Sequence, residues 1–412
     1  MTDTATPMNK GDRLDVRVER MAHGGEGIGH GPDGRVVFIR GAYPGDEVSA
    51  TVTEVKKRFA KADLLEVARR GEFHGDQTCP AAAEGAGCCD FGDVVHEREL
   101  DLKTDIFFGQ LGRVVPTEAL PEPERYDFAP HRGWRNRVRL GVDANGHAGA
   151  RKHASNDLVT DVACTQVADG LLDGIVGSGA RTFTPGAEVI VVKDADGQRH
   201  VVETRKAPRG TRVERVNTVI EGSGTVTERA DGTEFTFPAT AFWQAHAAAP
   251  DKYTGLIRSW LKDLTIDETK ARVGWDLYGG VGLFVPAIAD GLGEGAQVIS
   301  VDYSAAATMN VQEGLQGYDV QTVNNRVDKA VSGLPGPQVV VLDPPRIGAG
   351  AQVISQVAQK NPGRVIHVGC DPATFSRDIA LWAEHKYVIQ RLAIINAFPG
   401  THHFEVVAQL GK

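Results

Sequence analysis

The last third of the chain alternates short apolar runs with longer amphipathic ones. Nearly unbroken apolar runs lie at 274–278, 296–303, 337–345 and 364–370, and candidate helices follow at 283–292, 304–315, 351–360 and 372–385. Buried strands that alternate with helices are typical of a doubly wound α/β sheet with parallel strands. Two further apolar stretches within 387–410 have no helix between them. They predict an antiparallel hairpin at the end of the sheet.

The first 70 residues show short strands and glycine-rich turns, such as HGGEGIGHGPDG at 23–34. Turn signals at this close spacing predict a small β-barrel. Lys56, Lys57, Arg58 and Lys61 give this barrel a basic edge, which suits contact with RNA and equally suits a solvated loop.

Residues 71–240 predict a central α+β domain, so the expected domains are 1–70, 71–240 and 241–412. A helix is expected from Val94 to Leu111. Arg135, Arg137 and Arg139 alternate along a predicted strand, which would place all three on one face. Such a stripe fits contacts with phosphates, and it fits a plain solvent-facing strand equally well.

Composition places the chain among globular proteins. It has 412 residues, 41% hydrophobic and 24% charged, without a membrane-length apolar run or the apolar core of a signal peptide. We therefore expect a cytoplasmic protein without a membrane partner. The net charge is -9, with +1 in residues 1–70 and -10 in the remainder, so any contact with RNA must use local basic patches. Charge alone also fits an enzyme that acts on small molecules.

Polar side chains follow the predicted strands at the edge where open α/β sheets bind ligands. The residues at these strand ends are Asp276, Tyr278, Asp302, Asp343 and Cys370. The turn FPGTHH at 398–403 lies at the same edge, which brings Glu405 near Cys370. This clustering predicts an active site.

The turn DLYGGVG at 276–282 predicts a cofactor with an adenosine group. Gly280 and Gly282 let the backbone approach a ligand closely. Asp302 ends the next strand, where an acidic residue typically binds ribose hydroxyls. No Lys-Ser or Lys-Thr pair follows the glycines, which disfavours a P-loop. A dehydrogenase is also compatible with these residues.

Cys370 and Glu405 suit a particular chemistry. The helix expected after Cys370 would lower the pKa of its thiol and favour the thiolate. A thiolate that adds to C6 of uracil makes C5 nucleophilic toward a methyl donor, and a base must then remove the C5 proton. The alternatives are a buried structural cysteine and, for DPPR at 343–346, a merely rigid turn.

Together these motifs resemble the RNA uracil-C5 methyltransferase family, which includes the tRNA and 23S rRNA 5-methyluridine enzymes. GDRLDVRVERMAHGGEGIG with GAYPGDEV is similar to the family's N-terminal TRAM domain, an OB-like RNA-binding barrel. FWQAH (242–246), DLYGGVGLF, DPPRIGAG, VGCDPATFSRD and FPGTHHFE match in order. The resemblance implies a Rossmann-like methyltransferase fold, with Cys370 as nucleophile and Glu405 as base. It further implies that S-adenosylmethionine or the target base is contacted by Gln244, Tyr278, Gly280, Gly282, Asp302, Asp328 and Asp343.

The cysteines form a second candidate site. Cys79, Cys88 and Cys89 lie close together in the sequence, and Cys164 lies far downstream. Part of the family holds a [4Fe–4S] cluster on four cysteines, so the resemblance implies these four as ligands. The adjacent pair Cys88 and Cys89 departs from the family's spacing, and zinc is the alternative. Leu283 is a second departure, because the family usually has Asn there.

Three other functions match parts of the pattern. DPPR resembles the DPPY motif of amino-group methyltransferases, the cysteines fit an RNA-binding iron–sulfur sensor without catalysis, and the glycine turn fits a nicotinamide-dependent oxidoreductase. The favoured reading is a monomeric enzyme that methylates a looped-out or flipped uridine in rRNA or tRNA. No residue distinguishes the two RNA classes.

Overall fold

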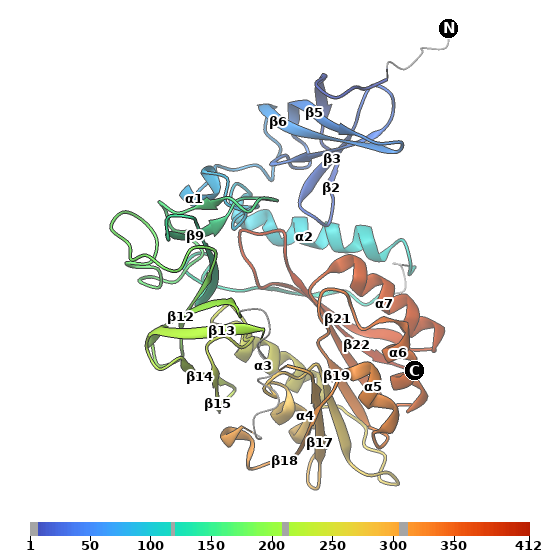
Figure 1. Cartoon of the computed structure of the whole chain (residues 1–412). Coiled ribbons are helices and arrows are strands. Elements are labelled where there is room, and N and C mark those ends of the chain that lie inside the picture. Colours follow the sequence, from blue (N-terminus) through green and yellow to red (C-terminus); the bar gives the residue numbers. More distant parts are fainter. Residues whose placement is uncertain (1–6, 117–119, 208–213, 305–311) are drawn as a thin grey trace.

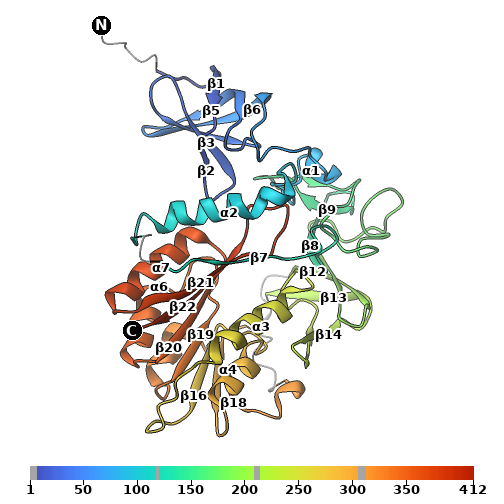
Figure 2. The same ribbon diagram turned by 180° about the vertical axis from the view of Figure 1, so that it is seen from behind.

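The computed structural model describes residues 7–116, 120–207, 214–304 and 312–412. Three large sheets follow one another along the chain, and helix α2 (His96–Leu111) lies between the first and the last of them (Figure 1). Figure 2 shows the same arrangement from behind. Within these described ranges, no helix is long and apolar enough to cross a membrane.

The first sheet is a curled, half-closed barrel, which confirms the expected N-terminal fold. Its strands run in the order β1-β5-β6-β4-β3-β2. They are β1 (Arg13–Arg17), β2 (Arg20–Met21), β3 (Glu26–His30), β4 (Val36–Arg40), β5 (Glu47–Val55) and β6 (Phe59–Arg69). Because β1 pairs with β5 and β2 pairs with β3, one bent stretch joins both edges of the sheet. Lys56, Lys57 and Arg58 are exposed at the turn between β5 and β6.

The central part follows the short helix α1 (Pro80–Ala83) and holds a second six-stranded sheet, in the order β10-β9-β8-β11-β12-β13, and a separate hairpin. The sheet contains β8 (Arg137–Val142), β9 (Ala148–Arg151), β10 (Leu158–Val159), β11 (Glu188–Lys193), β12 (Arg199–Lys206) and β13 (Arg215–Glu221), and the hairpin contains β14 (Thr225–Ala230) and β15 (Thr233–Pro238). All strand pairs in both are antiparallel.

The prediction that Arg135, Arg137 and Arg139 form a stripe on one face of a strand is wrong. Arg135 precedes strand β8, and its guanidinium lies over the ring of Trp134, 4.7 Å from the ring centre. The side chain of Arg137 is 11% exposed and lies 3.7 Å from the Glu228 carboxylate, whereas that of Arg139 is 47% exposed. Tertiary packing therefore uses the first two arginines inside the protein, where RNA phosphates do not reach them.

The third sheet carries the predicted doubly wound fold. Its strands run in the order β18-β17-β16-β19-β20-β22-β21-β7. They are β16 (Val273–Leu277), β17 (Gln297–Asp302), β18 (Asp319–Asn324), β19 (Val339–Leu342), β20 (Arg364–Gly369), β21 (Val388–Asn396), β22 (Glu405–Gly411) and β7 (Glu124–Asp127). Strands β16 to β20 are parallel, and β22 runs antiparallel to both of its neighbours. The predicted C-terminal hairpin is therefore confirmed.

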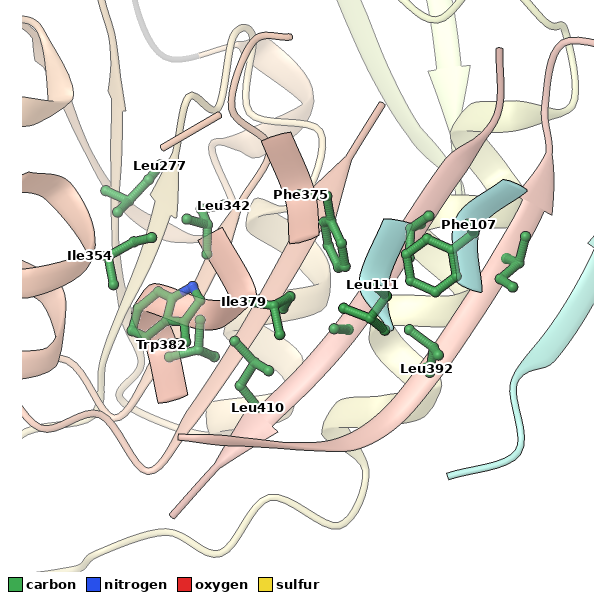
Figure 3. Close-up of a cluster of buried hydrophobic side chains, with 14 of the residues drawn as sticks. Phe107, Leu111, Leu277, Leu342, Ile354, Phe375, Ile379, Trp382, Leu392 and Leu410 are labelled. Carbon is green, nitrogen blue, oxygen red and sulfur yellow. The ribbon is translucent and has the colours of Figure 1, made fainter. Parts of the chain in front are cut away.

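Helices cover both faces of this sheet, which explains why its strands are apolar throughout. In β19, Val339 and Val341 face one core while Val340 and Leu342 face the other. Helices α3 (Ala249–Leu261) and α4 (Val285–Leu292) pack on one face. On the other face lie α5 (Val327–Ala330), η3 (Val331–Gly333), α6 (Gly350–Gln359), α7 (Pro372–Glu384) and α2. Figure 3 shows Phe107 and Leu111 of α2 in this second core, beside Phe375 and Leu392.

The sheet differs from the prediction at its edge. Strand β7 comes from the stretch expected to be central, and it pairs with β21 in parallel. The hairpin is therefore not the last element of the sheet, and the expected boundary at residue 240 is crossed by β7 and α2. A four-residue strand carries too little periodicity to reveal its partner. The helix predicted at 304–315 lies largely outside the described residues, which show the 3-10 turn η2 (Glu313–Leu315) at its end.

A fully buried lysine joins α2 to the C-terminal hairpin. The Lys103 ammonium donates to Glu99 and to the Asn396 side chain, at 2.6 Å each, and to the Phe398 carbonyl at 3.3 Å. Glu99 in turn accepts the backbone N–H of Gly400 at 3.0 Å. All three ammonium protons thus have acceptors, as a buried charge requires.

We predict that Lys103→Met destabilises the protein by about 3–5 kcal/mol, because it leaves the buried Glu99 carboxylate without its counter-charge. Urea unfolding followed by tryptophan fluorescence measures the loss. The double variant Lys103→Met/Glu99→Leu is expected to regain part of it, since no unpaired charge remains. A single variant within about 0.5 kcal/mol of the wild type would contradict this role, because that is the effect of an ordinary surface substitution.

Candidate active site and cysteine cluster

The strand order reverses between β16 and β19, which is the place where open α/β sheets bind ligands. Asp276 lies near the end of β16, and Asp343 directly follows β19. Asp276 is buried, and its carboxylate accepts the Ser300 hydroxyl at 3.2 Å. Burial raises the pKa of Asp276 to about 7.

The glycine turn after β16 is built for close approach of a ligand. Tyr278, Gly280 and Gly282 have φ values of 63°, 57° and 93°, in the left-handed region that favours glycine. The backbone N–H of Gly280 donates to Asp302 at 3.1 Å, so the turn and the end of β17 are joined. A Cβ atom at Gly279 would lie 2.3 Å from the Asp276 carboxylate, so no larger residue fits there.

Two more predicted cofactor residues lie in different surroundings. Asp328 opens helix α5 and is paired with Arg326 at 2.9 Å, and its charge acts on Tyr278. Gln244 precedes α3 and is 8% exposed. Within the described part of the chain, no residue hydrogen-bonds to the Gln244 amide, which leaves it free to bind a ligand.

Cys370 and Glu405 meet at the same edge of the sheet. Cys370 follows β20, and Glu405 begins β22, the neighbouring strand. Burial, then the charges of Glu405 and Asp343, raise the pKa of the Cys370 thiol to about 12, although Arg346 opposes this. Burial, then Asp343, also raise the pKa of Glu405 well above its ordinary value. One Glu405 oxygen is buried without a hydrogen-bond partner.

The helix after Cys370 does not favour the thiolate as expected. Asp371 caps that helix, and its side chain accepts the backbone N–H groups of Ala373 and Thr374 at 3.0 and 2.8 Å. The cap satisfies the amides whose positive ends would otherwise face the sulfur. Burial and, after it, the nearby carboxylates then dominate, so the raised pKa favours the protonated thiol.

Residues that the sequence did not single out complete this site. Arg346, within the DPPR motif, lies 3.2 Å from His403, and its charge lowers the pKa of both Cys370 and Glu405. Tyr253 of α3 has a buried hydroxyl without a hydrogen-bond partner, and the charges of Glu405, Asp343 and Cys370 act on it. The DPPR motif could have indicated Arg346 from the sequence, whereas nothing in the sequence around Tyr253 marks that residue as part of the site.

The turn at 397–404 between β21 and β22, the catalytic turn, is held from several segments. The Pro399 carbonyl accepts the Trp134 indole and the Gln166 amide at 3.2 Å each, and the Gly400 carbonyl accepts the backbone N–H of Phe91 at 3.1 Å. The backbone N–H of His402 donates to Asp90 at 3.1 Å.

The four predicted cysteine ligands come together. The Sγ atoms of Cys79 and Cys88 lie 4.0 Å apart, those of Cys79 and Cys164 3.9 Å, and those of Cys89 and Cys164 3.3 Å. Hydrogen bonds from the other three thiols lower the pKa of Cys79, with Cys164 contributing most. Four converging sulfurs form a donor set that suits a thiolate-bound metal centre.

Arg135 belongs to this cysteine site. Burial lowers the pKa of its guanidinium, and the charges of Cys164, Cys89 and Cys88 oppose that effect. A buried cation beside this cluster offsets the negative charge of those cysteines that are thiolates. The buried position of Arg135 therefore has an electrostatic explanation.

Comparisons with known proteins identify the family. Residues 7–65 match the family model of the TRAM domain, and residues 336–412 match that of tRNA (Uracil-5-)-methyltransferase. An uncharacterized RNA methyltransferase of Corynebacterium efficiens is 50% identical, over 98% of this chain and 96% of its own length. One from Streptomyces avermitilis is 30% identical, over 97% and 98%.

A solved structure shares the fold. The tRNA (uracil-54, C5)-methyltransferase of Pyrococcus abyssi, crystallised with S-adenosyl-L-homocysteine, superimposes with a TM-score of 0.70, over 96% of this chain and all of its own, at 18% identity. The chain is therefore an enzyme of the RNA methyltransferase family, of the type that carries an N-terminal TRAM domain and a uracil-5-methyltransferase region.

Proposed function

We propose that the protein transfers a methyl group from S-adenosylmethionine to C5 of a uridine in tRNA or rRNA, through a covalent bond between Cys370 and the base. The observation that carries this proposal is the single buried site shared by Cys370 and Glu405 on neighbouring strands. An amino-group methyltransferase or an oxidoreductase has no use for a thiol and a carboxyl at this place.

The residues around the glycine turn fit the methyl donor. The free amide of Gln244, the open turn at Gly280 and Gly282, and the carboxylates of Asp302 and Asp328 offer contacts for an adenosine and an amino-acid group. When bound, S-adenosylmethionine supplies an electrophilic methyl group on a positively charged sulfur. The carboxylates of Asp343 and Glu405 suit a cationic neighbour, because a positive charge lowers their raised pKa values.

The chain's own groups then perform the remaining steps. The Cys370 thiol first gives its proton to solvent. The thiolate then adds to C6 of the uracil, and the π electron pair of the C5–C6 bond moves onto the O4 carbonyl as an enolate. The enolate returns its electrons through C5, which bonds to the methyl carbon while the bond from that carbon to the donor's sulfur breaks and S-adenosylhomocysteine leaves. Glu405 removes the C5 proton, and these electrons restore the C5–C6 double bond as the Cys370 thiolate leaves.

The barrel lies where it could guide RNA to this site. The turn before β3 touches the catalytic turn, since a Cβ atom at Gly25 would lie 3.0 Å from Cβ of His402. Exposed Lys56, Lys57 and Arg58 offer phosphate contacts on the same barrel. Because Cys370 and Glu405 lie at a buried site, the target uridine must leave its stack to reach them. An RNA substrate and free cysteine thiols are consistent with a cytoplasmic location.

We also propose that Cys79, Cys88, Cys89 and Cys164 bind a [4Fe–4S] cluster. Four thiolate donors support this assignment. In a [4Fe–4S] cluster, however, each thiolate binds a different iron and points outward, so the four sulfurs stand farther apart than the 3.3–4.0 Å between the Sγ atoms here. The sulfurs must therefore spread to bind a cluster. A single tetrahedral ion is the second candidate, because thiolates 2.3 Å from one ion lie about 3.8 Å apart.

Either metal centre would support the catalytic turn. Asp90 and Phe91, which hydrogen-bond to His402 and Gly400, directly follow Cys89. Gln166, which hydrogen-bonds to Pro399, lies two residues after Cys164. A metal that ties these cysteines together therefore also ties together the chain segments that hold the turn. This role is structural and requires no redox step.

Cys370→Ala is expected to abolish methylation, because no other group makes C5 nucleophilic. Glu405→Gln is expected to trap the RNA on Cys370, since removal of a general base slows the release step by about 10²–10⁴-fold. Denaturing gels with radiolabelled RNA detect the adduct, and mass spectrometry of tRNA and rRNA from cells lacking the protein identifies the uridine. Glu384→Gln, the same change at an exposed helix end, is the control. Turnover in Cys370→Ala would refute the nucleophile.

Asp343→Asn is expected to lower the pKa of the Cys370 thiol, because it removes a negative charge beside the sulfur. Burial raises the pKa of Asp343 to about 7, so this carboxyl is neutral below that pH and charged above it. The variant's Cys370 should therefore alkylate faster than the wild type's only as the pH rises past about 7. Iodoacetamide labelling resolved by peptide mass spectrometry measures the rates. Equal rates at high pH, or a change in the exposed Asp319→Asn control, would argue against this coupling.

Cys164→Ser is expected to lower the bound metal several-fold and to reduce the methylation rate, because both the metal and the hold on the catalytic turn weaken. Iron, zinc and acid-labile sulfide are counted in anaerobically purified protein. About four irons and four sulfides per chain in the wild type identify the cluster. One zinc without sulfide identifies the single ion and overturns the cluster.

A further inference from the structure

Three metal-ligating side chains converge away from both sites described above. His96 is the first residue of α2, Asp127 is the last residue of β7, and His131 lies in the loop after β7. Their donor atoms all lie within 4.8 Å of one another. The Asp127 carboxylate oxygen Oδ2 is 3.3 Å from Nε2 of His131 and 3.6 Å from Nε2 of His96.

The two separations from Asp127 match ligands of one tetrahedral metal ion, and the imidazole rings of His96 and His131, whose centres lie 3.4 Å apart, must turn away from each other to bind it. Nitrogen and oxygen ligands bind zinc at about 2.0–2.2 Å, so two ligands on one tetrahedral ion lie about 3.3–3.6 Å apart. Both distances to Asp127 fall in this range. Two imidazoles and one carboxylate are also the ligand types that zinc takes when three protein groups bind it and a fourth position stays open.

Polar groups lie behind two of these ligands: Asp127 is hydrogen-bonded, and His96 has a carboxylate just beyond hydrogen-bond distance. The other oxygen of Asp127, Oδ1, accepts the Asn396 amide at 2.8 Å, which turns Oδ2 toward the histidines. The other nitrogen of His96, Nδ1, lies 3.8 Å from the Glu99 carboxylate. A histidine that binds a metal through one nitrogen usually donates its other N–H to a carboxylate, and such partners fix the orientation of the ring. Glu99 is itself held by Lys103.

The site is also open to solvent. The side chains of His96, Asp127 and His131 are 33%, 33% and 35% exposed, so an ion has a path of entry and a water has room at the fourth position. We propose that His96, Asp127 and His131 bind a divalent transition-metal ion, with zinc as the best match to the donors and spacing.

The ion's neighbours indicate a structural role. It would join the start of α2 to the end of β7 and to the loop that leads into Trp134. Trp134 and Glu99 both hydrogen-bond to the catalytic turn, at Pro399 and Gly400. The ion would thus hold segments that support the turn.

Zinc content decides the proposal. Full-length protein is dialysed against buffered zinc, and metal per chain is compared between the wild type, Asp127→Asn and His131→Gln. The wild type is expected to hold one zinc more than either variant, and its affinity for that zinc to exceed theirs by at least about tenfold. The difference between the X-ray absorption spectra of the wild type and a variant should show that the additional zinc has nitrogen and oxygen ligands at about 2.0–2.1 Å, not sulfur at 2.3 Å. Zinc should raise the melting temperature of the wild type more than that of either variant, since both variants keep the cysteine site.

His147→Gln is the matched control. His147 lies 3.6 Å from Asp143, in the same i,i+4 arrangement as His131 and Asp127 but without a second histidine among the described residues. This variant is expected to keep the full zinc content. Circular dichroism checks that Asp127→Asn and His131→Gln are folded. If folded Asp127→Asn holds as much zinc as the wild type, the proposal is overturned, and the three residues form a plain histidine–carboxylate ion pair. Coordination of the extra zinc by sulfur overturns it as well.

Discussion

The position of the catalytic turn depends on one buried ammonium group. Lys103 lies on α2, far from residues 397–404 in sequence, yet it binds Asn396 and Phe398 directly and holds Gly400 through Glu99. Because an unpaired charge in the interior is very costly, α2 and the turn adopt this arrangement together. The strand that begins with Glu405 follows the turn, so the distance between Glu405 and Cys370 depends on a contact with a helix outside the C-terminal region.

The electrostatics of the site follow from burial. Asp343, Glu405 and Cys370 are all acids brought into a poorly solvated place, where the second and third negative charges are increasingly unfavourable. Arg346 offsets part of this charge. Such a site holds protons until a cation enters it. This property suits the proposed reaction with a positively charged methyl donor, because the proposed nucleophile Cys370 would then become reactive mainly when the donor is present.

Supports from three other parts of the chain meet at the same turn. The cysteine-rich segment contributes Asp90 and Phe91, the central part contributes Trp134 and Gln166, and the barrel touches His402. The central part is thus less an independent domain than a frame for the active site. Strand β7, which belongs to the C-terminal sheet although it precedes the central strands in the chain, shows how closely the two are joined.

The sequence by itself determined the parallel strands of a doubly wound sheet, the hairpin and the edge on which the polar residues gather. Strands buried on both faces need continuous apolar runs, and parallel strands end at one edge, so position along the chain predicts position in space. Only the tertiary structure decided the positions of Arg135 and Tyr253, the convergence of His96, Asp127 and His131, the place of β7, and the raised pKa of Cys370. These depend on groups far apart in the chain, and on burial, which changes the charge a residue carries without leaving a local pattern.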